Sequence, residues 1–169
     1  MKKLFLSVSI IFLAATFAQA QSPLPKGAKQ FNAGVGLSGW GVPVYVGMDF
    51  GVHPDISVGG ELSFRGHRHR HHGVSYRHSI IGVAANGNYH FNRLLQIPSN
   101  WDLYAGLNLG FYSWGGDDHD DDHDHGHSGL DLGAQIGGRY YFTPKVGINL
   151  EFGGGLAFGG GKIGISVRF

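Results

Sequence analysis

The chain has 169 residues, with 13 Lys and Arg, 12 Asp and Glu, 30 glycines and no cysteine. The lack of cysteine excludes a disulfide framework, a thiol nucleophile and a thiolate metal site. The near balance of charge argues against a nucleic-acid-binding protein. Length and composition favour one all-β domain, because no long helical periodicity appears beyond the N-terminal segment.

The N-terminal segment has the form of a secretory signal peptide. A basic pair, Lys2-Lys3, precedes an almost wholly apolar run, Leu4–Phe17, and the small-x-small sequence Ala18-Gln19-Ala20 follows it. The alternative is a transmembrane anchor, but a helical span needs about 20 apolar residues and this run is shorter. We therefore predict a signal peptide over residues 1–20 and a mature domain over residues 21–169.

Eight stretches of the mature chain alternate apolar residues with small or polar ones. Successive side chains of a β-strand point to opposite faces, so each stretch has one apolar and one polar face. The last stretch shows the pattern, with Ile163 and Phe169 on the apolar phase and Lys162 and Arg168 on the polar phase. By their apolar sets, the predicted strands are Phe31–Leu37, Val44–Val52, Ile56–Phe64, Ser79–Phe91, Trp101–Phe111, Leu130–Phe142, Val146–Leu156 and Ile163–Phe169.

The connections between these strands carry turn signals. Tight turns are predicted at His53-Pro54-Asp55 and Thr143-Pro144-Lys145, because proline fixes φ and aspartate favours turns. A longer connection runs from Asn92 to Asn100. The glycine-rich run Gly153–Gly161 is expected to form the last hairpin, since no Lys-Ser/Thr pair follows it as in a phosphate-binding loop.

Charged residues within the predicted strands are confined to the polar phase. An Arg or Lys facing lipid near mid-membrane costs about 2 to 4 kcal/mol, so we interpret the apolar phase as the outside of a transmembrane barrel. The alternative is a soluble eight-stranded barrel of the lipocalin type, with the apolar phase inside. Such a barrel would have a surface rich in Lys and Glu, whereas the polar phase here is mostly Gly, Asn and Ser.

The strand alternation and the terminal segment KIGISVRF resemble the small eight-stranded outer-membrane β-barrel proteins, such as OmpX and the membrane domain of OmpA. The resemblance covers about the whole mature chain. It implies an antiparallel, multi-pass and monomeric barrel in the outer membrane of a Gram-negative bacterium. Its implied partners are outer-membrane lipids and the outer-membrane assembly machinery, which would read the C-terminal strand.

The interior of an eight-stranded barrel is just wide enough for side chains to fill. Buried charges need partners, so we predict one internal network of Glu61, Arg139, Glu151, Lys162 and Arg168. Small inward residues leave the alternative of a narrow path for ions or small solutes.

Two long polar segments, Gly66–Arg77 and Ser113–Ser128, are predicted as loops on the same, extracellular side, because an even number of crossings separates them. Neutral imidazole and carboxylate are ligands of Zn²⁺, Cu²⁺ and Ni²⁺. The alternative is a pair of solvated loops that attract each other by charge. The candidate metal ligands are His67, His69 and His71 in the first segment and His119, Asp122, His123, Asp124, His125 and His127 in the second.

No enzyme activity is predicted from the sequence. Ser63, Ser75, Ser79 and Ser113 lie near histidines, but no spacing singles one out as a nucleophile. The predicted function is a structural or surface-interaction role that displays His- and Asp-rich loops and requires no cofactor. A narrow-pore channel for small solutes or ions is the alternative.

Overall fold

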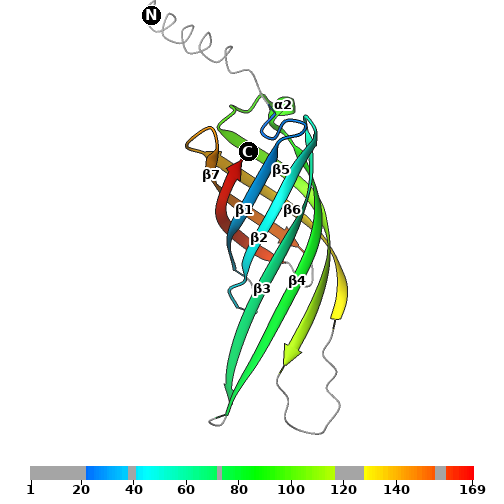
Figure 1. The fold of residues 1–169 in the computed structure, drawn as a ribbon, viewed down its shortest axis with the longest axis vertical. Coiled ribbons are helices and arrows are strands. Elements are labelled where there is room, and N and C mark those ends of the chain that lie inside the picture. The colour runs from blue at the N-terminus through cyan, green and yellow to red at the C-terminus, as the bar shows by residue number, and fades with distance from the viewer. Residues whose placement is uncertain (1–21, 38–40, 72–73, 117–127, 155–158) are drawn as a thin grey trace, which may run out of the picture.

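The computed structural model describes residues 22–37, 41–71, 74–116, 128–154 and 159–169, which form one closed barrel of antiparallel strands (Figure 1). Each strand pairs with the next in sequence, and the first pairs with the last to close the sheet. The strands are β1 Lys29–Leu37, β2 Val44–His53, β3 Ile56–His71, β4 Val74–His90, β5 Trp101–Gly116, β6 Ser128–Tyr141, β7 Val146–Gly154 and β8 Gly160–Arg168.

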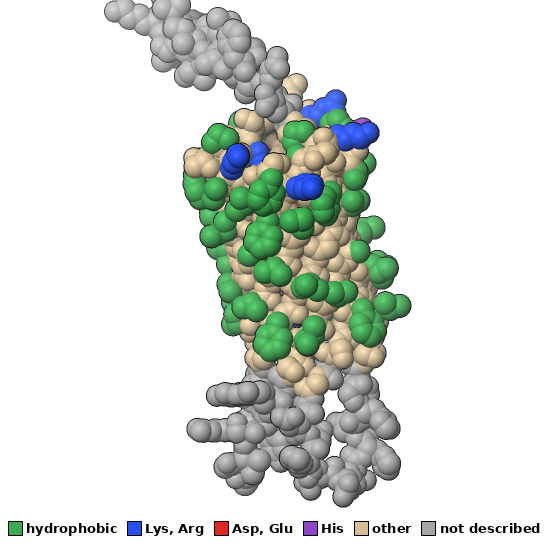
Figure 2. All heavy atoms as spheres, in the orientation of Figure 1, with side chains coloured by type: hydrophobic (Ala, Val, Ile, Leu, Met, Phe, Trp, Pro, Cys, Tyr) green, Lys and Arg blue, Asp and Glu red, His purple; other side chains and the backbone are tan. Residues whose placement is uncertain are grey.

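The barrel turns its apolar residues outward and its polar residues inward. In β6, Leu132 and Ile136 are 72% and 62% exposed, whereas Asp131, Gln135 and Arg139 are buried. Apolar side chains cover the visible side wall, where no Asp or Glu appears (Figure 2). The predicted eight-stranded antiparallel barrel is confirmed. The soluble alternative is wrong, because it requires the apolar phase inside.

The prediction of a loop over Gly66–Arg77 is wrong for most of that segment. The backbone remains paired from His67↔His78 to His71↔Val74, so β3 and β4 form a long hairpin that extends past the barrel wall (Figure 1). Ladder pairing depends on backbone hydrogen bonds and not on an apolar phase. An alternation of His with Arg has no apolar face, which is why the periodicity missed this part of the hairpin.

The other differences lie at strand ends. Phe91 and Phe142 were expected to end strands, but they follow the last residues of β4 and β6. The connection from Asn92 to Asn100 contains a one-turn helix, α2 (Asn92–Leu95), which is the only helix in the described ranges and is too short to cross a membrane. The turn at Thr143 forms as predicted, with the Val146 amide donating to the Thr143 hydroxyl oxygen at 2.9 Å.

Residues 22–28 fold against the barrel at the end where the C-terminus lies (Figure 1). We call this the terminal end, and the end with the β3–β4 hairpin the hairpin end. Leu24 is 1% exposed. The Gly27 amide donates to the Gly51 carbonyl at 2.8 Å, and the Gly51 amide donates to the Ala28 carbonyl at 3.0 Å. A Cβ at Gly51 would lie 2.2 Å from the Pro25 carbonyl oxygen, so this close approach requires glycine.

Candidate functional site in the barrel lumen

The lumen is filled by polar side chains from alternate positions of every strand. Inward residues that are far apart in sequence meet there, because each strand contributes a residue to the same level of the barrel. Two groups of charged residues lie at different heights. We call them the Lys162 cluster (Glu61, Glu151 and Lys162) and the Arg139 cluster (Asp49, His90, Asp102 and Arg139).

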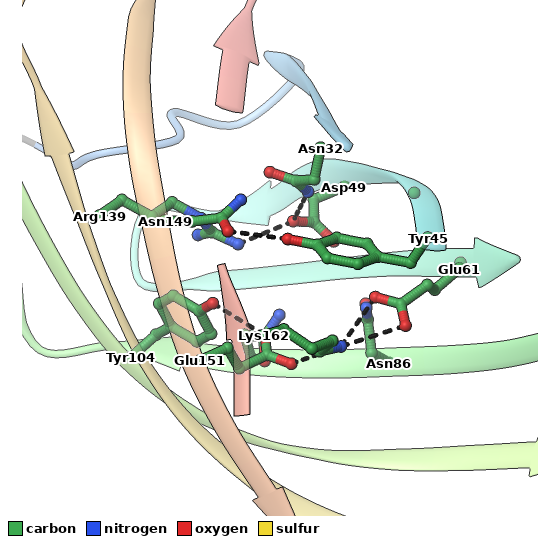
Figure 3. A pocket seen from close by; sticks show the side chains of 13 residues that line it. Asn32, Tyr45, Asp49, Glu61, Asn86, Tyr104, Arg139, Asn149, Glu151 and Lys162 are labelled. Atoms are coloured by element: carbon green, nitrogen blue, oxygen red, sulfur yellow. Dashed lines mark hydrogen bonds and ion pairs between the residues drawn. The ribbon is translucent and has the colours of Figure 1, made fainter. Parts of the chain in front are cut away.

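In the Lys162 cluster one ammonium group lies between two carboxylates (Figure 3). Lys162 Nζ is 2.8 Å from Glu61 Oε2 and 2.6 Å from Glu151 Oε1. The three side chains are largely buried, at 17%, 11% and 12% exposure for Lys162, Glu61 and Glu151. The structure therefore brings together three of the five residues in the predicted internal network, contributed by β8, β3 and β7.

In the Arg139 cluster one guanidinium spans two carboxylates. Arg139 Nη1 donates to Asp102 Oδ2 at 2.8 Å, and Arg139 Nη2 donates to Asp49 Oδ2 at 3.0 Å. The other Asp102 oxygen is 2.7 Å from His90 Nδ1. All four side chains are almost fully buried. Arg139 thus pairs with carboxylates other than the predicted Glu61 and Glu151.

Tyr104 connects the two clusters. Its hydroxyl donates to Glu151 Oε2 at 2.8 Å, and the Arg139 guanidinium carbon lies 4.1 Å from the centroid of its ring. Arg168 lies apart, with its guanidinium carbon 3.2 Å from the centroid of the Tyr141 ring. No carboxylate among the described residues is paired with Arg168. The structure therefore separates Arg168 from the residues with which it was predicted to pair.

Ser57, His90 and Asp102 form a chain of hydrogen bonds that the sequence did not reveal. Ser57 Oγ is 2.9 Å from His90 Nε2, which completes the order of a Ser-His-Asp triad. All three side chains are buried, and Arg139 holds the second oxygen of Asp102. A carbonyl substrate needs access to the serine oxygen. We therefore interpret this chain as part of the packed lumen.

The sequence distances explain why this chain was missed. His90 lies 33 residues from Ser57 and 12 residues from Asp102. The sequence could have indicated this contact only through position, because all three residues lie on the inward phase near the terminal ends of β3, β4 and β5. Other serines were considered as nucleophiles, because they lie near histidines along the chain.

The spaces that border the Lys162 cluster are small. Three separate cavities of about 20, 20 and 10 Å³ each have Glu61 and Lys162 in their walls. A cavity needs about 10 to 15 Å³ to hold one water molecule. Each of these three spaces has room for about one water, so side chains fill the lumen at these positions.

The sequence profile of the family described as the outer membrane protein beta-barrel domain matches residues 6–166. The chain belongs to this family. Its strands therefore cross an outer membrane, with the apolar phase facing lipid, and the predicted resemblance to small outer-membrane barrels is confirmed. No curated protein sequence matches the chain.

Solved structures of small outer-membrane barrels share the fold. Ail of Yersinia pestis, in complex with the heparin analogue sucrose octasulfate, is 13% identical with a TM-score of 0.60, covering 85% of this chain and 99% of that chain. OprG of Pseudomonas aeruginosa is 9% identical with a TM-score of 0.59, covering 86% and 97%. Neisserial surface protein A is 14% identical with a TM-score of 0.54, covering 83% and 93%.

The first group of predicted metal ligands lies on the hairpin of β3 and β4 in this outer-membrane barrel. For His67, His69 and His71 the structure describes the backbone, which pairs with His78, Tyr76 and Val74. Within the described ranges, no three His, Asp or Glu side chains are arranged to hold a metal ion. The other predicted ligands, which are His119, Asp122, His123, Asp124, His125 and His127, lie outside the described residues.

Gly137 provides the space that the Tyr104 ring occupies. A Cβ at Gly137 would lie 2.3 Å from Tyr104 Cζ, so Gly137→Ala must displace the ring that touches both clusters. We expect this change to lower the free energy of unfolding by about 1 to 3 kcal/mol, the usual cost of overpacking. Urea unfolding in phospholipid vesicles measures it. Gly87→Ala is the control, because no atom lies within 4 Å of a Cβ there. Equal stability of the two variants would contradict the prediction.

Proposed function

We propose that this protein is a structural outer-membrane barrel of a Gram-negative bacterium that displays its hairpin end to the exterior for surface interactions. The proposal places the terminal end in the periplasm. The observation that carries it is the lumen, in which both charged clusters are internally paired and little free volume remains. A closed barrel contributes its wall and its surface segments to the envelope and not a passage through it.

The packing of the Lys162 cluster weighs against the channel alternative. An ion that passes this level must separate Lys162 from two carboxylates at 2.6 and 2.8 Å, or displace buried side chains. Breaking such a pair leaves an uncompensated buried charge, which costs several kcal/mol. The Arg139 cluster imposes a second barrier of the same kind at another level.

We expect the refolded mature protein to produce no reproducible discrete openings in planar bilayers at neutral pH. The physical reason is that the side chains of both clusters fill the lumen and are fixed by their ion pairs. The measurement is single-channel recording, with a general porin as the positive control. Openings whose conductance changes on substitution of Glu61, Arg139 or Glu151 would instead identify a narrow-pore channel.

We further propose that the protein is monomeric and that the assembly machinery recognises its C-terminal strand. In support, β8 pairs with β1 from Gln30↔Arg168 to Leu37↔Gly161, so it is the strand that closes the barrel. Phe169 follows the last residue of β8 directly and is 65% exposed.

The His- and Asp-rich segments are proposed to bind a divalent transition metal weakly, as Zn²⁺, Cu²⁺ or Ni²⁺. The supporting observation is that the hairpin that carries His67, His69 and His71 lies at the same end of the barrel as the ends of β5 and β6, which flank the Asp-rich segment (Figure 1). We also expect the barrel to fold without a cofactor, because a closed sheet satisfies its backbone groups internally.

Calorimetry on the refolded barrel tests metal binding. We expect binding at neutral pH that weakens below about pH 6, because unperturbed histidine titrates near 6.5 and protonated imidazole cannot ligate. A variant with His119, His123, His125 and His127 changed to Ala should lose much of the affinity and keep the fold. If this variant binds as tightly as the parent, the acidic segment is not the site. If the parent gives no heat with any of the three metals, the proposal is wrong.

A further inference from the structure

An apolar groove of about 860 Å³ runs over the lipid-facing surface of β5, β6 and β7 in the half of the barrel near the terminal end. Its floor is formed where Gly138 of β6 stands between Leu103 of β5 and Leu150 of β7 in the strand register. Because Gly138 has no side chain, the two leucines border a shallow depression, into which Leu103 leans, since a Cβ at Gly138 would lie 3.2 Å from Leu103 Cδ2. Ala105, on the next outward position of β5, extends this low floor. Most of the side chains that line the groove are apolar, as a site for an acyl chain requires.

The groove ends in an aromatic pair toward the terminal end. The rings of Trp101 and Tyr140 lie with centroids 4.8 Å apart, and both are partly exposed, at 46% and 37%. Trp and Tyr are enriched where a membrane protein meets the headgroups, since their rings combine an apolar body with a polar group. This pair therefore places the headgroup level at the terminal mouth of the groove.

A lysine lies in the turn that joins β6 and β7, two of the strands that line the groove, at the terminal end. Lys145 is three residues before Ile148, which lines the groove, and its carbonyl accepts a hydrogen bond from the Arg168 amide at 2.8 Å. Its side chain is exposed, and no carboxylate among the described residues pairs with it. Basic side chains gather at this end of the barrel, above the apolar wall (Figure 2). The exposed cations of the terminal end are Lys26, Lys29, Arg93 and Lys145.

We propose that this groove binds one anionic phospholipid, with an acyl chain over Gly138 and the phosphate at Lys145. Charge selects the ligand, because an exposed ammonium at headgroup level attracts a lipid with net negative charge more than a zwitterionic one. This inference rests on the proposed function only in the choice of membrane leaflet. A periplasmic terminal end places the groove in the inner leaflet of the outer membrane. The chemistry of the site is independent of that orientation.

Fluorescence quenching of Trp101 tests the proposal. The chain has three tryptophans, so Trp40→Phe together with Trp114→Phe leaves Trp101 as the only reporter, within the groove itself. This variant is refolded into symmetric phosphatidylcholine vesicles that contain a minor fraction of either phosphatidylglycerol or phosphatidylcholine with brominated acyl chains. We expect the brominated anionic lipid to quench Trp101 several-fold more efficiently than the brominated zwitterionic lipid.

Matched variants separate the headgroup site from the acyl-chain site. Lys145→Gln should abolish the difference between the two lipids, whereas Lys26→Gln, on the β2 side of the same end, should leave it intact. Gly138→Leu should reduce quenching by both lipids, and Gly87→Leu, at another outward glycine with open space around it, should not. Heat-modifiable gel migration checks that every variant is folded.

Equal quenching by the two lipids, or a preference that survives Lys145→Gln, would overturn the proposal. Loss of quenching as the protein-to-lipid ratio rises would also overturn it, because a second copy of the chain would then cover the groove. None of these results depends on the lumen or on the orientation, since symmetric vesicles present both lipids to either end. Failure of the closed-barrel function would appear in single-channel recordings instead.

Discussion

Arg139→Met is expected to destabilise the barrel strongly, by about 3 to 5 kcal/mol in the free energy of unfolding. The change removes the cation that holds Asp49 at 3.0 Å and Asp102 at 2.8 Å, and both carboxylates are almost fully buried. Deleting one partner of a buried pair leaves an uncompensated charge, which is far more costly than the loss of an exposed pair. Urea unfolding in phospholipid vesicles, followed by tryptophan fluorescence, gives the measurement.

Arg93→Met is the matched control for this experiment. Arg93 Nη1 lies 3.1 Å from Asp55 Oδ2, similar in distance to the Arg139 pairs, but the Arg93 side chain is 50% exposed. Exposed pairs contribute about 0 to 1 kcal/mol, so this variant should stay close to the parent. Adding Asp49→Asn and Asp102→Asn to Arg139→Met should recover part of the loss. If Arg139→Met costs no more than Arg93→Met, the Arg139 cluster does not stabilise the fold.

The wall of the barrel could be predicted from the sequence because lipid imposes a strict period of two on each strand. Every predicted strand overlaps an observed one, from Phe31 in β1 to Val167 in β8. The period of two in hydrophobicity no longer indicates a strand where the chain extends beyond the lipid-facing wall. The segment from His67 to His71 continues the same ladder with no apolar phase, so the alternation could not assign it to a strand.

For the lumen, the sequence predicted which residues point inward but not which of them pair with one another. The alternation shows which side chains point inward, but the stagger between strands decides which of them lie at the same height. Glu61 meets Lys162 across 101 residues of sequence, and Asp49 meets Arg139 across 90. His90 and Ser57 were on inward positions but carried no signal of their own. Their partners follow from barrel geometry, which a single strand does not encode.

Lys162→Met is expected to place Glu61 and Glu151 in the lumen without their shared cation. Lys162 Nζ lies within 3.1 Å of both Glu61 oxygens and 2.6 Å from Glu151 Oε1, so both carboxylates lose their ion pair in one step. We expect the free energy of unfolding to fall by about 3 kcal/mol, at the lower end for broken buried pairs because these side chains retain some exposure. Urea unfolding in vesicles measures the loss.

A charge-neutral background separates electrostatics from packing at this level of the lumen. In a protein that already carries Glu61→Gln and Glu151→Gln, Lys162→Met leaves no buried charge behind and should cost much less than in the parent. A cost that is equal in both backgrounds would assign the role of Lys162 to its alkyl chain and not to its charge.

The single variant Lys162→Met should also produce no openings in planar bilayers, because Arg139 still spans Asp49 and Asp102 at the other level. Discrete openings in Lys162→Met alone would show that one cluster, and not two, keeps the barrel closed.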